Sequence, residues 1–230
     1  TDDTDDTDDT DDTDDTDTDT LSLSFDGVDD YVEIPDLPEE SDGTISIWVK
    51  SPTTGDDNAW LTNGVPMWLS ISLLTTSDGE IMFTATSDSS VPSWVELTGA
   101  VSLNQWVHVV ATWEDGIATL YIGGAAVSTT SMSGDPLSME SPWDIGRNSY
   151  LEQSSYDYFI GQLRELAVWS RALSATEVAT VMSDGAAAAD STSLEVFFPM
   201  DEGTGSMLTD QSGNGRHAII DGATWVIEAP

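Results

Sequence analysis

The stretch WVHVVATWEDGIATLYIGGAAV, residues 106–127, decides the fold of this chain. Every second side chain from Val107 to Trp113 is apolar, which places these side chains on one face of a β-strand. Asp115-Gly116 and Gly123-Gly124 then supply two tight turns, because glycine adopts the positive φ that a two-residue hairpin requires. The stretch therefore predicts three antiparallel strands joined as two consecutive hairpins, with most of the remaining chain as strands that pair or pack with them.

The length and composition of the chain allow a large β-sandwich. The chain has 230 residues, 39% hydrophobic content and nine tryptophans, enough for a substantial core in one large domain or two small ones. Five Lys and Arg face 43 Asp and Glu, which gives a net charge of −38. So acidic a surface excludes nucleic acids and anionic membranes as partners. It suits high salt or divalent cations, which screen the self-repulsion.

Several common sequence features are missing. The chain has no cysteine, so disulfides cannot stabilise it, and no apolar run reaches the roughly 18 residues of a membrane span. Because the sequence starts at Thr1 rather than Met, we expect a processed or excised segment that has lost a targeting sequence. No asparagine precedes the x-Ser/Thr acceptor pattern, so we expect any attached sugar to be O-linked.

An acidic repeat opens the chain. Residues 1–15 are five copies of Thr-Asp-Asp, and residues 16–20 alternate Thr and Asp. One interpretation is a disordered acidic linker, because nothing apolar is available for burial. The other is an extended, polyproline-II-like stalk whose Thr row suits O-glycosylation and whose Asp rows suit divalent cations. In the second case the glycosylated residues are Thr1, Thr4, Thr7, Thr10, Thr13 and Thr16.

Local signals predict further strands and one helix. Short alternating or β-rich runs predict strands within residues 21–25, 44–50, 68–86, 94–97 and 194–198. Ser174 and Glu177 have the spacing of a capping box, which marks the start of a short amphipathic helix. Gly185 suits the end of that helix. The chain thus predicts a two-sheet antiparallel sandwich with one short helix.

Longer segments resemble a known family. FDGVDDYVEIP (25–35), TISIWVK (44–50) and QWVHVVATWEDGIATLYIGG (105–124) resemble the laminin-G-like jelly rolls of the concanavalin A-like lectin/glucanase superfamily. IGRNS (145–149) and two later segments extend the resemblance to about residues 21–226. The resemblance implies an all-β, two-sheet antiparallel jelly-roll sandwich over residues 21–230, preceded by the repeat at 1–20 as a stalk or linker.

The order of segments departs from this family in one respect. The block FPMDEGTGSMLTDQSGNGRHAIIDGATWV, residues 198–226, commonly precedes the FDGVDDYV strand in the family, whereas here it comes last. Either the domain is circularly permuted, or its final strands complete a neighbouring copy, since unpaired strand edges accept strands from another chain. We favour closure within the chain.

The sequence offers no catalytic array. Glucanases of the superfamily place Glu, Asp and Glu at alternate positions of one strand, so that all three carboxylates enter one cleft. Here Glu33, Asp36 and Glu39 stand three apart, which sends successive carboxylates to opposite faces of a strand. His108 and His217 are expected to fill structural positions. We therefore expect a protein that is not an enzyme.

Calcium is the cofactor that the sequence allows. Two Gly-rich bends concentrate carboxylate and amide oxygens, and the candidate ligands are Asp26, Asp29, Asp30, Asp210 and Asn214. Calcium takes six to eight oxygen ligands, including backbone carbonyls that such bends present. The resemblance adds that some laminin-G-like domains bind calcium near loops. The alternative is that these side chains satisfy the backbone of their own turns.

Aromatic side chains are the candidates for sugar recognition, because sugars stack on exposed rings. Trp48, Trp106, Trp113 and Trp169 match the core strands of the family and are expected to be buried. The glycan-binding candidates lie in or beside expected loops: Trp60, Trp68, Trp94, Trp143 and Tyr150. Anchoring of these loops against the sandwich is the alternative role for each of them.

The leading hypothesis is a non-catalytic module at the cell surface or in the extracellular space, part of a fibre or adhesin. Its partners would be glycans, attached to the repeat or bound by loops, and further copies of itself. The alternative is a carbohydrate-binding module of a larger secreted enzyme, with the repeat as a disordered linker.

Overall fold

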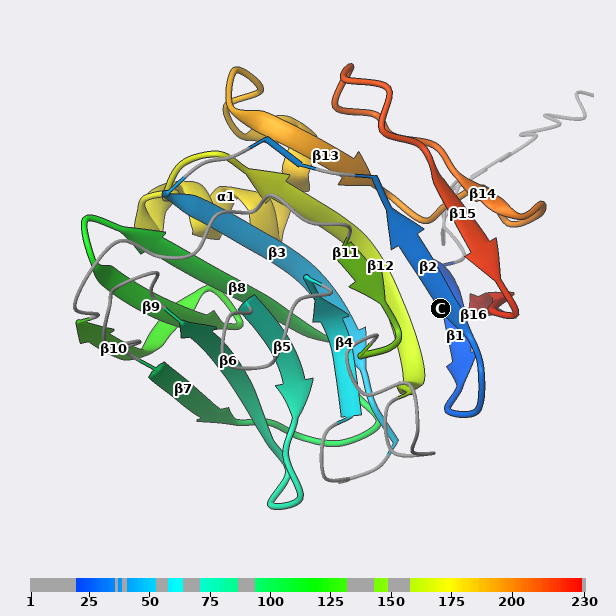
Figure 1. Ribbon diagram of the computed structural model, residues 1–230, viewed down its shortest axis with the longest axis horizontal. Coiled ribbons are helices and arrows are strands. Elements are labelled where there is room, and N and C mark those ends of the chain that lie inside the picture. Colours follow the sequence, from blue (N-terminus) through cyan, green and yellow to red (C-terminus); the bar gives the residue numbers. More distant parts are fainter. Residues whose placement is uncertain are drawn as a thin grey trace, which may run out of the picture.

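Two antiparallel sheets face each other across one core (Figure 1). The computed structural model describes residues 20–35, 37–38, 41–52, 58–63, 71–86, 94–131, 143–148 and 158–228. The predicted all-β sandwich with one short helix is confirmed.

The first sheet, sheet A, contains the stretch that decides the fold. Its strands in spatial order are β10 (Ala125–Ser131), β9 (Ile117–Ile122), β8 (Val107–Glu114), β3 (Gly43–Lys50), β12 (Ile160–Trp169), β1 (Thr20–Asp26) and β16 (Thr224–Glu228), and β13 (Leu194–Phe198) pairs with β12. The two predicted hairpins are present as β8–β9 and β9–β10. At the first turn Asp115 and Gly116 have φ values of 50° and 71°, as a tight hairpin requires.

The second sheet, sheet B, faces it. Its strands in order are β14 (Met207–Leu208), β15 (Ala218–Asp221), β2 (Tyr31–Ile34), β11 (Trp143–Ile145), β4 (Asn58–Thr62), β5 (Ile71–Thr75), β6 (Glu80–Thr86) and β7 (Trp94–Ala100). A turn at residues 77–79, within the segment predicted as strands at 68–86, joins β5 to β6.

Large aromatic side chains fill the space between the sheets. The largest fully buried ones there are Trp60, Trp113, Trp143, Phe25, Phe83, Phe159 and Phe198, whereas the equally buried Trp169 lies on the outer face of sheet A. Phe83 of sheet B stacks on Trp113 of sheet A with centroids 5.9 Å apart and planes 19° apart. Each such side chain contributes roughly 2–3 kcal/mol through the apolar area it removes from water. The inward face of β8 is therefore the apolar face that its alternation predicts.

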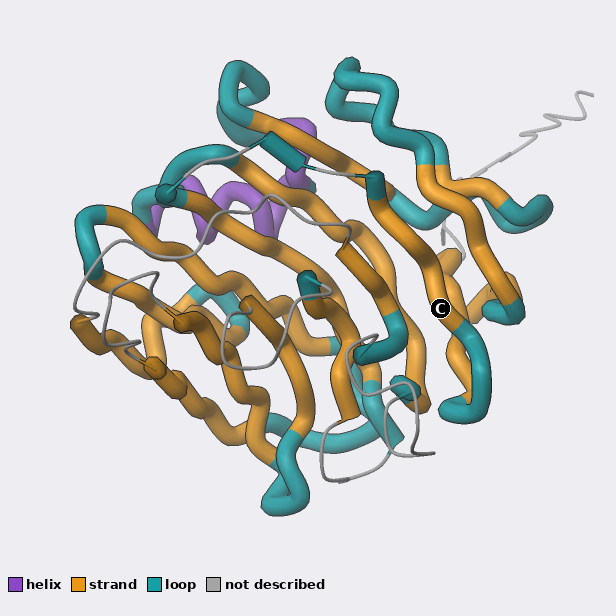
Figure 2. The backbone as a smooth tube through the Cα atoms, in the orientation of Figure 1, coloured by secondary structure: helices purple, strands orange, loops and turns teal. Residues whose placement is uncertain are grey.

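One helix covers part of the outer face of sheet A. Helix α1 (Ala175–Asp184) begins at the predicted capping box, in which Glu177 N donates to Ser174 Oγ and Ser174 N donates to Glu177. Its buried Val178 and Val181 pack against the outward-facing Val110 and Trp169 of the sheet. A short 3₁₀ turn, η3 (Ala186–Ala188), follows Gly185. Figure 2 shows this helix on the side of sheet A away from sheet B.

The C-terminal strands close the sandwich within the chain. Strand β16 pairs with β1 and β15 pairs with β2, so Figure 1 places red strands beside blue ones. Strand β1 pairs with the first half of β12, up to Leu163, and β13 takes the place beside Leu166 to Trp169. Thr20 and Glu228 are opposite each other in the β1–β16 ladder. No helix among the described residues is long and apolar enough to cross a membrane.

Candidate binding sites

The turn between β1 and β2, residues 26–30, gathers three carboxylates; we call it the acidic turn. The side chain of Asp26 accepts a hydrogen bond from Val28 N at 2.8 Å, and Asp30 accepts one from Asp26 N at 2.8 Å. These bonds fold the carboxylates toward one another, so that one oxygen from each of Asp26, Asp29 and Asp30 lies within 4.8 Å of the others. The sequence placed these residues together correctly.

A fourth carboxylate, that of Asp221 at the end of β15, lies near the acidic turn. Burial raises the pKa of Asp30; the hydrogen bond from Asp26 N opposes this, and the charges of Asp26, Asp29 and Asp221 add to it. Gly222 lies directly against Asp30, because a Cβ on Gly222 would fall 2.1 Å from Asp30 Oδ1. The arrangement is a concentration of hard, negatively charged oxygens, which is the chemistry that divalent cations prefer.

Asp210 and Asn214 belong to a different bend and serve its backbone. Asp210 accepts hydrogen bonds from three backbone amides, those of Phe197, Ser212 and Arg216, at 2.9–3.0 Å. Burial alone would raise the pKa of Asp210, but these donors hold it below its usual range. The Asn214 amide donates to the carbonyl oxygens of Leu194 and Glu195.

These two residues are therefore not partners of the acidic turn. Among the described residues, the cluster of metal-ligating side chains holds Asp26, Asp29 and Asp30 without Asp210. The structure supports the alternative interpretation for this second bend, in which Asp and Asn satisfy the turn itself.

Two of the predicted sugar-binding tryptophans are in the core, so their prediction is wrong. Trp60 and Trp143 are both 0% exposed. Trp60 lies on β4 and donates its indole N–H to Thr75 Oγ1 at 3.1 Å. Trp143 lies on β11, and both β4 and β11 are interior strands of sheet B. Both rings belong to the core cluster between the two sheets. Trp68, Tyr150, the side chain of Trp94 and the Thr residues of the repeat lie outside the described part of the chain.

The opposite correction applies to Trp48 and Trp106, which were expected in the core. Both are partly exposed. On β3, Ile45, Ile47 and Val49 face the core, so Trp48 and the following Lys50 point to the outer face of sheet A. The alternation of this strand carried the signal that Trp48 lies on the polar face.

Aromatic rings and cations alternate along this outer face. The Arg164 guanidinium lies 4.8 Å from the Trp48 ring centroid and 4.9 Å from that of Trp106. Trp48 in turn contacts His108, with centroids 5.0 Å apart, and Lys50 lies 5.9 Å from Trp106. Each contact between a cation and a ring face contributes about 0.5–2 kcal/mol. We call these five residues the tryptophan–arginine face.

A β-bulge aims Arg164 at this face. The β12–β3 register shifts between Arg164 and Ala167. Glu165 has a backbone φ of 52°, which is unusual for a residue other than glycine. Arg164 therefore points outward beside Trp48 while Leu166 still enters the core. The bulge also brings Glu165 Oε1 to 3.6 Å from Arg164 Nη1. Burial raises the pKa of Glu165, the charge of Arg164 opposes this, and Asp201 adds to it.

Glu228 and His108 complete the surroundings of the face. Glu228 accepts hydrogen bonds from Lys50 Nζ and, at 3.0 Å, from Trp106 Nε1. The bond from Lys50 lowers the pKa of Glu228, burial opposes this, and the bond from Trp106 supports it. Burial, helped by the charge of Arg164, lowers the pKa of His108 to about 4. His108 is therefore neutral at pH 7, and its Nε2 lies 2.9 Å from Ser46 Oγ.

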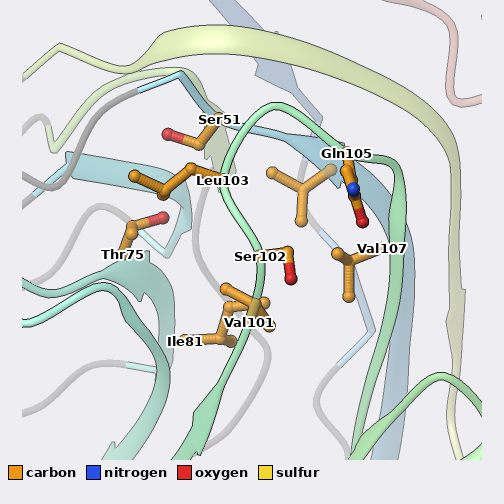
Figure 3. A pocket seen from close by; sticks show the side chains of 9 residues that line it. Ser51, Thr75, Ile81, Val101, Ser102, Leu103, Gln105 and Val107 are labelled. Atoms are coloured by element: carbon orange, nitrogen blue, oxygen red, sulfur yellow. The ribbon is translucent and has the colours of Figure 1, made fainter.

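A hollow at one end of the sandwich has a different character (Figure 3). Its volume is about 250 Å³, part of which is open solvent. Its lining is aliphatic, hydroxyl and amide: Val49, Ser51, Thr75, Ile81, Val101, Ser102, Leu103, Gln105 and Val107. None of these described lining residues is aromatic or charged, so they offer a sugar neither a stacking surface nor an ionic partner.

The fold and these surfaces define a jelly-roll domain of the lectin type. The family model described as concanavalin A-like lectin/glucanases superfamily matches residues 26–179, and the chain belongs to this family. The match ends before β13, so the C-terminal strands that close the sandwich lie outside it. A comparison with curated protein sequences finds no match.

Solved structures share the fold at low sequence identity. A candidate carbohydrate-binding protein from Bacteroides ovatus matches with a TM-score of 0.69 and 18% identity over 92% of this chain, and the chain spans 60% of that protein. A heptameric SAP-like pentraxin from Limulus polyphemus matches with a TM-score of 0.59 and 19% identity, covering 87% of this chain and 94% of the pentraxin. Domain 4 of an extracellular GH43 arabinanase from Geobacillus stearothermophilus, in complex with arabinotriose, matches with a TM-score of 0.59 and 20% identity, covering 72% of this chain and 82% of that domain.

Proposed function

We propose that this chain is a non-catalytic extracellular module that binds glycans through its tryptophan–arginine face and serves in adhesion. The observation that carries the proposal is the pair of partly exposed tryptophans, Trp48 on β3 and Trp106 just before β8, which both contact the Arg164 guanidinium. Sugars pack their C–H faces against indole rings and hydrogen-bond to neighbouring polar groups. Two similar structures, the Bacteroides protein and the arabinanase domain in complex with arabinotriose, support carbohydrate as the class of ligand.

Binding to a glycan array, followed by isothermal titration with the sugars that bind, tests this proposal. Trp48→Ala and Trp106→Ala should each weaken binding at least ten-fold. Trp225→Ala is the matched control, because Trp225 is also a partly exposed tryptophan but packs on the core side of β16. Equal loss in all three variants, or no binding by the unmodified chain to any glycan on the array, would contradict the proposal.

We further propose that calcium binds at the acidic turn and supports the sandwich. Asp26, Asp29 and Asp30 would hold the ion, with Asp221 adding negative charge nearby. The ion would supply a positive charge that offsets the repulsion of these carboxylates. Because the turn joins β1 to β2, and so sheet A to sheet B, an ion there would stabilise the connection between the two sheets.

We separately propose that the acidic repeat is an O-glycosylated stalk of a surface fibre. Its support is positional: strand β1 begins at Thr20, the last residue of the repeat segment. Intact-mass analysis of the native protein with fragment mapping tests it. Hexose-sized additions on the Thr-Asp-Asp residues support the stalk, whereas an unmodified repeat favours the alternative of a plain linker to a larger secreted enzyme.

A further inference from the structure

We propose that Arg164 binds the carboxylate of an acidic sugar, so that the tryptophan–arginine face prefers anionic glycans to neutral ones. This inference rests on the glycan-binding function proposed above and specifies its ligand. The preference is unexpected for a chain with a net charge of −38, so it has to follow from local structure.

Arg164 differs from the other cations in its ion pairing. The chain has five Lys and Arg in all. Arg147, Arg171 and Arg216 each have a carboxylate oxygen within 3.1 Å, and Lys50 is bonded to Glu228. The carboxylate paired with Arg164 is that of Glu165, at 3.6 Å, beyond hydrogen-bond range. Arg164 is thus the cation whose hydrogen-bonding capacity the described residues leave open.

Packing holds the Arg164 guanidinium in place for a planar partner. The rings of Trp48 and Trp106 contact it at similar distances, and about a fifth of the side chain, 22%, stays exposed. A guanidinium presents its donors as a rigid fork that matches the two oxygens of a carboxylate. Because the tryptophans already restrict the side chain, little conformational entropy remains to be lost when a carboxylate binds.

Polar atoms around Arg164 also lack partners. Arg164 Nε and Gln162 Oε1 are buried without a hydrogen-bond partner, as are Ser22 Oγ and His108 Nδ1. Gln162 is opposite Lys50 in the β12–β3 ladder, and His108 is opposite Trp48 in the β3–β8 ladder, so both belong to the same outer face. Buried polar groups of this kind are rare in folded proteins and concentrate where a ligand or water completes the network.

The negative charge of the whole protein further restricts the class of anionic ligand that this face can bind. A polyanion such as a nucleic acid or a heavily sulfated chain would meet the repulsion of the whole acidic surface. A sugar that presents one carboxylate to Arg164, with its ring against Trp48 or Trp106, gains the local attraction with far less of that repulsion. Glycans with isolated uronic-acid-type carboxylates fit these conditions.

A substitution at Glu228 provides a second, independent test of the inference. The Glu228 carboxylate neutralises Lys50 beside Arg164 and receives the Trp106 indole N–H. The substitution Glu228→Gln removes the negative charge and keeps one acceptor oxygen in place of the two that Lys50 and Trp106 use. The ratio of the affinity for an acidic sugar to that for its neutral counterpart should therefore rise about three- to ten-fold.

Titration calorimetry with digalacturonate and with its methyl ester, in 0.15 M NaCl and EDTA, tests the inference. The ester has the same rings without the charge, and EDTA prevents a calcium ion at the acidic turn from bridging to the carboxylate. We expect the unmodified chain to bind the acid at least ten-fold more tightly than the ester. Arg164→Gln should lower the acid-to-ester affinity ratio to about one, and Arg164→Lys should recover part of the preference.

The outcomes separate this inference from the function it rests on. If acid and ester bind equally and Trp48→Ala abolishes both, the face binds glycans but Arg164 does not select acids, and the inference fails alone. If neither sugar binds and the glycan array is also negative, both proposals fail. The thermal midpoint of each variant shows that it is folded, and Glu228→Gln decides the question should Arg164→Gln not fold: an unchanged acid-to-ester ratio in that variant overturns the inference.

Discussion

The indole ring of Trp113 occupies the space where a side chain on Gly43 would begin. The two residues are opposite each other in the β3–β8 ladder, and a Cβ on Gly43 would lie 2.3 Å from Cζ2 of Trp113. Distances this short do not occur between real Cβ atoms and their neighbours. Glycine at position 43 is therefore needed for a close approach rather than for an unusual φ.

Gly43→Ala should destabilise the protein by about 1–3 kcal/mol, because the fully buried Trp113 has no free space to move into. Urea unfolding monitored by tryptophan fluorescence measures the loss. The double variant Gly43→Ala/Trp113→Phe should lose less than the sum of the two single variants, because the smaller ring relieves the clash. Simple additivity would show that the two positions do not interact.

Because of the capping box of α1, part of the stability of the protein should be lost as the pH falls through the acidic range. The hydrogen bond from Arg171, followed by that from the Ser174 amide, lowers the pKa of Glu177 to about 2 from a usual value of 4.5. A lowered pKa means that the ionised Glu177 stabilises the fold above pH 4.5, and that this contribution disappears as the pH falls toward 2.

Comparison with Glu177→Gln isolates that contribution from the many other carboxylates. The thermal midpoint of the unmodified chain should exceed that of the variant at pH 7, and the difference should shrink steadily between pH 4.5 and pH 2. Circular dichroism at a series of pH values measures both midpoints. A difference that stays constant over this range would mean that ionisation of Glu177 does not stabilise the fold.

Under the calcium proposal, Asp30→Asn should have opposite effects with and without the ion. In EDTA at pH 7 it should be neutral or slightly stabilising, because the raised pKa of Asp30 means that ionisation above its usual value of 3.8 costs stability. In 5 mM CaCl₂ the unmodified chain should gain several degrees in thermal midpoint and the variant should not.

Two controls separate calcium binding from general screening of a highly acidic protein. NaCl at matched ionic strength should give a smaller rise that is equal in both proteins. Asp78→Asn, an exposed carboxylate in the β5–β6 turn, should respond to calcium like the unmodified chain. If Asp30→Asn also keeps the full calcium response, the ion does not bind at the acidic turn.

Asp210 should prove to be a structural residue. Asp210→Ala leaves three backbone amides without their acceptor, and the loss should be roughly 3 kcal/mol in urea unfolding. Calcium should not restore the loss, since these amides need an acceptor rather than a cation. Asp201→Ala, an exposed neighbour in sequence, should change stability by less than about 0.5 kcal/mol. A calcium-dependent recovery of Asp210→Ala would reinstate this residue as a metal ligand.

Much of the fold is predictable because its signals are local. The hairpins of residues 106–127 follow from alternation and from glycine turns, and α1 follows from the spacing of Ser174 and Glu177. That β1 and β13 share the edge of β12 is not predictable in this way. It depends on pairing between residues far apart in the chain, for which no short sequence pattern exists.

The candidate sites show the same difference between local features, which are predictable, and contacts between distant parts of the chain, which are not. Asp26, Asp29 and Asp30 are adjacent in sequence, so their clustering is predictable, whereas Asp221 reaches them only through the fold. Trp60 lies on a strand that is buried at all five positions, so no alternation reveals which way its ring points. Trp48 could have been placed correctly from the alternation of β3, had family resemblance not assigned it to the core.

The pairing of Thr20 with Glu228 has a mechanical consequence. Both residues lie at the same end of the β1–β16 ladder, so tension applied between them loads the ladder hydrogen bonds one after another rather than all at once. Such a zipper opens at low force, and Glu228 leaves Lys50 and Trp106 at the first step. Pulling on the two ends of this ladder would thus separate Glu228 from the tryptophan–arginine face before the core yields.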